Sequence, residues 1–215
     1  MRENTGIVTK LNIRNSCRDN RGMSLVELIV VIAIMTVLIG IVGYSLNMLF
    51  GAEARQAAKK VESQLNDIKT GAMSRASESM EIRYIDIVSE FGTKSAAAQA
   101  GCDKDGFYAV KKIATVQNES TIKVSYTDVE YTRLSSGKVE YTIVPDGDDA
   151  KKTIIDSSNG NSIEIEFDRS TGKLKNYMVN GTAVDVSNNV DLQFKCGLKT
   201  YEIEITASTG RHVMK

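Results

Sequence analysis

Glu27 is the first candidate for a chemical role, because this acidic residue stands at the start of a long apolar run. The nineteen residues 28–46 that follow include no charged side chain. As a helix, residues 23–46 would span roughly 36 Å, which is enough to cross a membrane hydrocarbon core of about 30 Å. A carboxylate inside the end of such a helix is costly unless it is paired. We therefore expect Glu27 to have a cationic partner from outside this segment.

The other polar residues form no recognisable catalytic motif. No nucleophile elbow, zinc-protease or phosphate-loop spacing occurs. His212 is the single histidine and lies close to the C-terminus, where we expect it in a flexible tail. Asp146, Asp148 and Asp149 lack the spacing of an EF-hand loop, so a solvated acidic turn is favoured over a calcium site. We expect no enzyme activity, no cofactor and no metal.

The charge balance argues against nucleic acid as a specific partner. The chain has 27 basic and 27 acidic side chains, and its basic pairs at 111–112 and 151–152 are too few for a basic binding surface. The distribution is more informative, because residues 1–22 carry five basic and two acidic residues. By the positive-inside rule, this end lies in the cytoplasm and the larger C-terminal part lies outside.

Two other kinds of N-terminal segment compete with a processed membrane helix. A secretory signal peptide cleaved at the A-x-A sequence 52–54 would release a soluble protein, but its apolar region would be only about 7 to 15 residues long. An uncleaved signal anchor would leave the chain in the membrane. Neither alternative explains a glycine directly before the span or Glu27 one turn inside it.

The segment Gly22-Met23-Ser24-Leu25-Val26-Glu27, followed by the apolar run, resembles the signal of type IV prepilins and type II secretion pseudopilins. The resemblance implies that a membrane-embedded prepilin peptidase cuts after Gly22 and that the new N-terminal residue, Met23, is methylated. It also implies that Glu27 faces the N-terminal amine of a neighbouring subunit in a filament. The expected partners are other pilin or pseudopilin subunits, an inner-membrane platform, an assembly ATPase and membrane lipid.

A second resemblance concerns the C-terminal half. Residues 163–172 and the ending 201–211, a strand followed by Thr-Gly-Arg, are similar to minor pseudopilins of the secretion and competence systems. Family precedent also exists for a disulfide bridge between early and late parts of such a domain, here Cys102 and Cys196. From the sequence alone, a bridge and two free thiols are both open, and Cys17 would be lost with the leader.

The hydrophobic periodicity predicts an α+β fold, and the resemblance implies that this fold is pilin-like. Beyond the span, apolar residues recur three and four apart from Ala54 to Ala76, which indicates that the helix continues as an amphipathic helix. Alternating apolar and polar residues then predict a single antiparallel β-sheet packed on the second half of this helix, with an irregular loop at 92–106. The predicted strands are 80–87, 121–126, 138–143, 162–167 and 201–205, with weaker signals at 107–116, 174–179 and 190–194.

These patterns predict four segments. They are a cytoplasmic leader at 1–22, a transmembrane helix at 23–46, its amphipathic continuation at 47–79 and an extracytoplasmic β-rich domain at 80–215. We expect a structural subunit that is processed and assembles into a pilus or a secretion or competence pseudopilus. The alternative is a signal-anchored binding or enzyme domain that does not assemble.

Overall fold

The computed structural model describes residues 24–74, 80–102, 104–116, 124–155, 161–185 and 187–215. The chain divides into two compact units between Val42 and Gly43. The N-terminal unit contains the first part of one long helix. The second unit contains the rest of that helix and the strands that the structure describes.

The long helix is α1, Leu25–Ser74. Its backbone ladder is uninterrupted because the single proline of the chain is Pro145, far from the helix. In the N-terminal unit its large apolar side chains are exposed on every side, from 43% for Val31 to 74% for Leu25. By length and composition, α1 is the one helix among the described residues that could cross a membrane.

In the second unit, α1 buries one face. The predicted amphipathic helix is confirmed here, because the apolar positions three and four apart are each at most 3% exposed. Ala76, the last residue of the predicted stripe, lies outside the described residues. The buried positions are Ala54, Ala57, Ala58, Val61, Leu65, Ile68 and Ala72.

The strands form two antiparallel sheets rather than the single sheet that the sequence predicts. The first sheet has the order β3-β2-β1-β6-β7-β8 and the second has the order β11-β10-β9-β4-β5. The chain therefore leaves the first sheet after β3, returns to it for β6, and leaves it again after β8. The first sheet consists of β1 (Met80–Glu90), β2 (Gly106–Val116), β3 (Val124–Ser135), β6 (Ser162–Phe167), β7 (Leu174–Val179) and β8 (Thr182–Ala183). The second consists of β4 (Glu140–Pro145), β5 (Thr153–Ile155), β9 (Asn189–Cys196), β10 (Lys199–Thr206) and β11 (Arg211–Met214).

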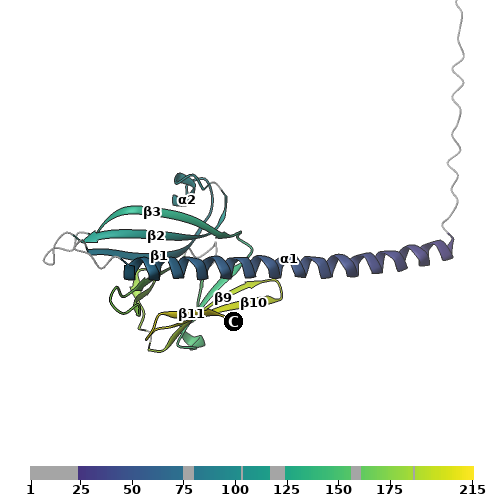
Figure 1. The fold of residues 1–215 in the computed structure, drawn as a ribbon. Helices are drawn as coiled ribbons and strands as arrows, with labels where there is room; N and C mark the ends of the chain where they lie inside the picture. The colour runs from purple at the N-terminus through teal and green to yellow at the C-terminus, as the bar shows by residue number, and fades with distance from the viewer. Residues whose placement is uncertain (1–23, 75–79, 103, 117–123, 156–160, 186) are drawn as a thin grey trace, which may run out of the picture. The chain divides into compact units, whose positions relative to one another are not determined.

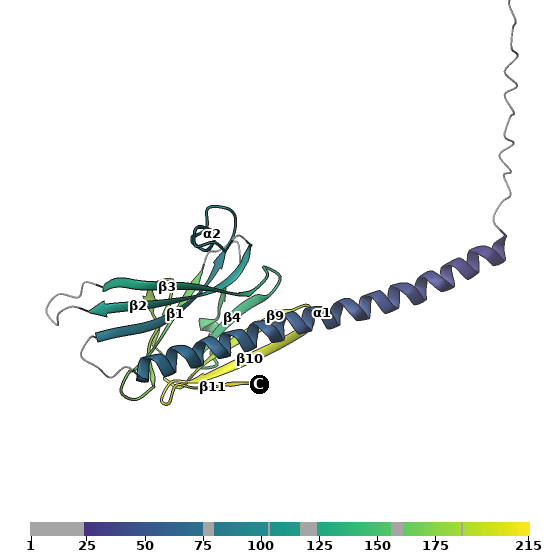
Figure 2. The same ribbon diagram turned by 45° about the horizontal axis from the view of Figure 1, so that its top comes forward.

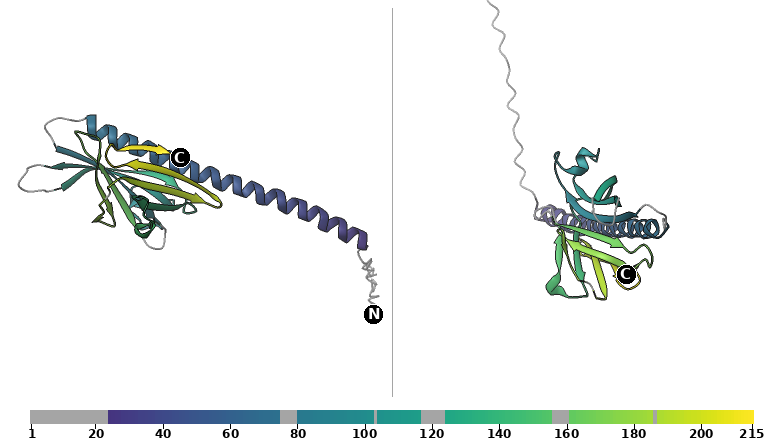
Figure 3. Two further views of the ribbon diagram at one scale, coloured as in Figure 1. Left: turned by 90° about the horizontal axis from the view of Figure 1, so that it is seen from below. Right: turned by 90° about the vertical axis from the view of Figure 1, so that its left-hand side faces the viewer.

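Both sheets pack on the second half of α1. Figures 1 and 2 show this part of the helix with β1–β3 on one side and β9–β11 on the other, and Figure 3 shows the same layers from two further directions. One continuous core joins the three layers, because Leu65 of α1, Ile85 and Ile165 of the first sheet, and Leu192 and Ile203 of the second sheet belong to the same buried cluster. The α+β layout predicted from the sequence is therefore present.

Strand β3 extends to Ser135, well beyond the predicted strand 121–126, of which residues 121–123 lie outside the described residues. The other differences from the sequence prediction concern short elements. The expected irregular loop at 92–106 contains the short helix α2, Ala96–Gln99, whose first turn is capped by the Ser95 side chain. Strands β5, β8 and β11 are additional to the predicted ones and are only two to four residues long. A 3₁₀ turn, η1 (Asp149–Lys151), precedes β5.

Candidate functional site

The first turn of α1 carries the residues expected to matter most for function. Ser24 stands directly before the helix, and its carbonyl accepts the first helical hydrogen bond from the Leu28 N–H at 3.1 Å. Glu27 follows three residues after Ser24, which is the spacing of a capping box. A carboxylate in the first turn also interacts favourably with the positive end of the helix dipole. This local role of Glu27 is additional to the expected intersubunit one.

Glu27 is exposed and has no ion-pair partner among the described residues. Gly22 and Met23, the predicted processing residues, lie outside the described residues. The apolar surface that follows Glu27 is exposed all round the helix over residues 28–42. Such a surface is stable in lipid or against other apolar helices, and not in water.

The two C-terminal segments that the sequence singled out lie against each other at the far end of α1. Gly210 of the Thr-Gly-Arg turn approaches Gly172 so closely that a Cβ atom at position 210 would come 2.0 Å from the Gly172 carbonyl oxygen. Lys69 of α1 donates hydrogen bonds to the carbonyl oxygens of Thr209 and Gly210 at 3.0 and 3.1 Å. Because Gly210 has a φ of +59°, glycine suits both the backbone and the space at this position. These turns therefore fasten the sheets to the helix.

A row of charged side chains lies on the face of the first sheet opposite the core. Asp86 of β1 pairs in register with Glu164 of β6, and Lys112 of β2 forms an ion pair with Asp86. On the same face, the Lys175 ammonium lies 2.8 Å from a Glu166 carboxylate oxygen. Burial, followed by the negative charge of Asp86, raises the pKa of Glu164 to about 7. The row can therefore take up a proton near neutral pH.

The predicted solvated acidic turn has a structural role. The Asp146 carboxylate accepts backbone N–H bonds from Ser187, Asn188 and Asn189 at 3.1, 2.7 and 3.2 Å. These bonds hold the pKa of Asp146 below its usual value, with the one from Asn188 contributing most. The sequence could not reveal these hydrogen bonds, because their donors lie some forty residues further along the chain. Among the described residues, no group of His, Cys, Asp and Glu side chains could hold a metal ion.

His212 lies in a strand, so the expectation of a flexible tail is wrong. It belongs to β11 and pairs in register with Ile205 of β10. Its ring is half-buried, with its centroid 6.4 Å from that of Phe167. This burial lowers the pKa of His212. Short edge strands of this kind give little alternation in sequence, which is why the terminal strand was not predicted.

The two cysteines of the second unit are free thiols in the structure. Cys196 is buried at the end of β9 in the second sheet, whereas Cys102 is partly exposed in the segment between α2 and β2. Burial raises the pKa of the Cys196 thiol, which makes it a weak nucleophile.

Residues 17–43 match the family model described as the prokaryotic N-terminal methylation motif. This segment includes the glycine, the first-turn glutamate and most of the apolar run. The chain therefore carries a signal of the type IV prepilin and pseudopilin kind, as the sequence predicted. No curated protein and no solved structure matches the chain.

Proposed function

We propose that this protein is a prepilin-like structural subunit, cut after Gly22 and methylated on Met23, that assembles into a type IV pilus or a secretion or competence pseudopilus. The observation that carries the proposal is the methylation motif at residues 17–43, joined to a helix whose apolar side chains are exposed all round. Prepilin peptidase, other pilin subunits, an inner-membrane platform and an assembly ATPase are the partners of such a subunit. A minor-subunit role rests on the resemblance of residues 163–172 and 201–211 alone.

Glu27 acts in assembly in this proposal. Cleavage frees the amine of Met23, which remains positively charged after the separate methylation step. The amine of a neighbouring subunit supplies the cation that Glu27 lacks among the described residues. Placing an unpaired carboxylate in an apolar helix bundle costs on the order of a few kcal/mol. An ion pair with the neighbouring amine offsets this cost. The exposed position of Glu27 supports this role.

The proposed topology has the N-terminus in the cytoplasm and the second unit outside the cytoplasmic membrane. The excess of basic residues in 1–22 supports this orientation. Before assembly, the apolar part of α1 holds the subunit in lipid. After assembly, the same surface packs against the helices of other subunits.

Peptide mass spectrometry of the membrane-extracted protein tests the processing step. We expect a mature chain that begins with N-methyl-Met23 in cells with an active prepilin peptidase. Gly22→Leu should block processing, because a bulky residue does not fit a peptidase that cuts after glycine. A wild-type chain that still begins at Met1 would favour the signal-anchored alternative, and one that begins near Glu53 would indicate a secreted soluble domain.

Glu27→Ala tests the assembly step separately. Its cleavage should stay largely intact, while its incorporation beside wild-type subunits should fall because the intersubunit ion pair is lost. Asp185→Ala is the matched control, since it removes an exposed carboxylate from the second unit. Normal incorporation of Glu27→Ala, or an equal loss in both variants, would contradict the role of Glu27.

A further inference from the structure

A basic cavity lies between the second half of α1 and the start of β10. We propose that this cavity binds the phosphate headgroup of an anionic phospholipid, in the membrane leaflet from which α1 emerges. The proposal rests on membrane anchoring and not on filament assembly, so the two can fail separately. The cavity measures about 410 Å³ and is lined by Met48, Gly51, Ala52, Arg55, Gln56, Lys59, Lys199 and Tyr201.

The lining of the cavity has the charge that an anionic headgroup requires. Three of its residues, Arg55, Lys59 and Lys199, are basic, and none is acidic. Among the described residues these three form no ion pair, whereas Lys112 and Lys175 each pair with a carboxylate. Arg and Lys side chains are the usual ligands of phosphate oxygens. The lining of the cavity therefore carries three basic side chains and no carboxylate.

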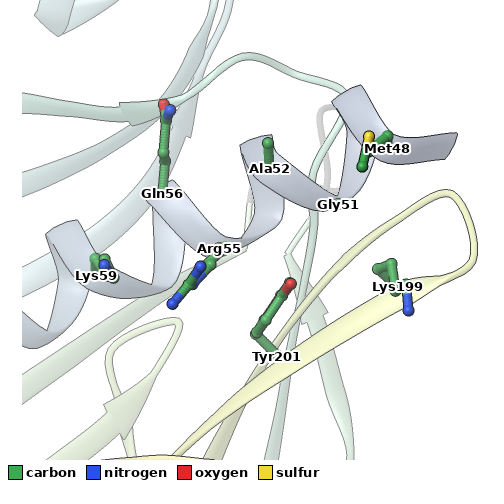
Figure 4. Close-up of a pocket in the computed structure, with 8 residues that line it drawn as sticks. All are labelled: Met48, Gly51, Ala52, Arg55, Gln56, Lys59, Lys199 and Tyr201. Atoms are coloured by element: carbon green, nitrogen blue, oxygen red, sulfur yellow. The ribbon is translucent and has the colours of Figure 1, made fainter. Parts of the chain in front are cut away.

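The lining residues come from the helix and from the second sheet. Figure 4 shows the Arg55 side chain extending from α1 toward the side on which Tyr201 lies, with the Tyr201 hydroxyl directed toward the helix. The helix residues Met48, Ala52, Arg55 and Lys59 are three or four positions apart, so they follow one side of α1. Tyrosine combines an apolar ring with a hydrogen-bonding hydroxyl, a combination that suits the lipid headgroup layer.

The helical lining of the cavity begins close to the end of the predicted span and runs from Met48 to Lys59. Arg55 is nine residues beyond Leu46, the end of the predicted span, or about 14 Å along the helix axis. The headgroup layer on each side of the hydrocarbon core is about 5 to 8 Å thick. Helical side chains lean toward the helix N-terminus, and long basic side chains extend to reach headgroups. Arg55 can therefore reach back toward this layer, whereas Lys59, one turn further along α1, acts on it through its charge over less than a Debye length.

Gly51 lets the hairpin of β9 and β10 approach the helix at this point. A Cβ atom at position 51 would lie 3.0 Å from Lys199 Cγ, tighter than ordinary van der Waals contact. A glycine inside a helix by itself only weakens the helix, by about 1 kcal/mol relative to alanine. In the structure, the glycine places Lys199 beside the helical cations, although some 140 residues separate them in sequence.

The test uses the full chain in lipid nanodiscs of phosphatidylcholine with increasing fractions of phosphatidylglycerol, and measures the lipid retained on the protein by native mass spectrometry. Arg55→Gln/Lys59→Gln is compared with Lys151→Gln/Lys152→Gln, which removes two exposed charges from the 3₁₀ turn and its C-cap. Each basic residue near an anionic surface strengthens binding about fivefold. We expect about 25-fold weaker phosphatidylglycerol retention in the first variant and little change in the second.

Three results would overturn the proposal. An equal loss in both variants would indicate bulk charge rather than a site. Equal retention of phosphatidylcholine and phosphatidylglycerol by the wild-type protein would exclude recognition of an anionic headgroup. Self-association that depends on Arg55 and Lys59, with lipid retention unchanged, would assign the cavity to a carboxylate of a second copy. Urea unfolding of both variants, followed by circular dichroism, confirms that the second unit remains folded.

Discussion

The N-terminal unit and the second unit place apolar residues of the same helix in opposite environments. From Leu25 to Val42 the apolar side chains of α1 are exposed, whereas from Ala54 to Ala72 its apolar stripe is buried under two sheets. The first part is apolar all round and the second is apolar on one face only. A helix that is hydrophobic on every side needs lipid or other helices, and a helix with one apolar stripe needs its own domain. The two parts of α1 are therefore suited to two different environments.

The comparison implies that substitutions can affect membrane insertion of the N-terminal unit and stability of the second unit independently. Substitutions in the N-terminal unit should change membrane insertion without changing the stability of the second unit. Substitutions in the second unit should have the reverse effect. The chain contains no tryptophan, so tyrosine fluorescence or circular dichroism reports unfolding of the full chain in detergent.

Val37→Lys should have the largest effect, and only on insertion. Val37 lies in the middle of the apolar segment and is 63% exposed in the structure. A lysine at the centre of a membrane helix costs about 2.5 to 3.5 kcal/mol, to which the lost valine adds about 0.3 kcal/mol. Alkaline extraction of membranes measures the fraction inserted. The control is Ile154→Lys on the edge strand β5, where a lysine is well tolerated. If Val37→Lys stays in the membrane fraction like this control, the segment does not span the bilayer.

Leu65→Ala should destabilise the second unit by about 3 kcal/mol and leave insertion unchanged. Leu65 is fully buried in the contact between α1 and the two sheets, and leucine-to-alanine changes in cores cost about 2 to 5 kcal/mol because they leave a cavity. Urea denaturation measures the change. The matched control is Leu38→Ala, whose leucine is 52% exposed in the N-terminal unit. A similar shift from both substitutions would mean that the two parts of α1 unfold together.

Glu164→Gln should change how the stability of the second unit depends on pH. The pKa of Glu164 is raised from 4.5 to about 7, so between these values the folded state binds more protons than the unfolded state. Its contribution to stability is therefore present below about pH 4.5 and is lost as the pH rises through about 7. We expect Glu164→Gln to be about 1 kcal/mol more stable than wild type above pH 7, after allowing for solvent screening of a half-exposed group.

Urea midpoints measured at several pH values test this prediction, with Asp185→Asn as an exposed control. Glu164→Gln should reduce the loss of stability between acidic and neutral pH, because glutamine remains neutral beside Asp86. An unchanged pH profile would mean that another group takes up the proton. Membrane insertion should be unaffected, in keeping with the independence of the two units.

The two units also differ in how much of them the sequence could predict. The spacing of Ala54, Val61 and Leu65 was sufficient to predict the buried stripe, because helix periodicity is a local property. The division of the strands into two sheets was missed, because strand partners depend on contacts between distant segments. The basic cavity was missed for the same reason, since Lys199 joins Arg55 only through the fold. The processing motif, by contrast, is contained in consecutive residues and needs no fold to be recognised.

Tyr177→Phe should have the smallest effect, and it separates apolar from polar contributions in the second unit. The Tyr177 side chain is buried in the core beneath the first sheet, and its hydroxyl has no hydrogen-bond partner among the described residues. Removing an unpaired buried hydroxyl ends its desolvation cost, so we expect a change between zero and about 1 kcal/mol in the stabilising direction.

Tyr141→Phe is the contrast, because the buried Tyr141 hydroxyl lies 2.8 Å from Ser135 Oγ. Losing this hydrogen bond should destabilise the second unit by about 1 kcal/mol. Opposite signs in urea denaturation would show that apolar packing sets the stability at Tyr177 and hydrogen bonding contributes at Tyr141. A loss of equal size in both variants would mean that the Tyr177 hydroxyl has a partner after all, such as a bound water molecule.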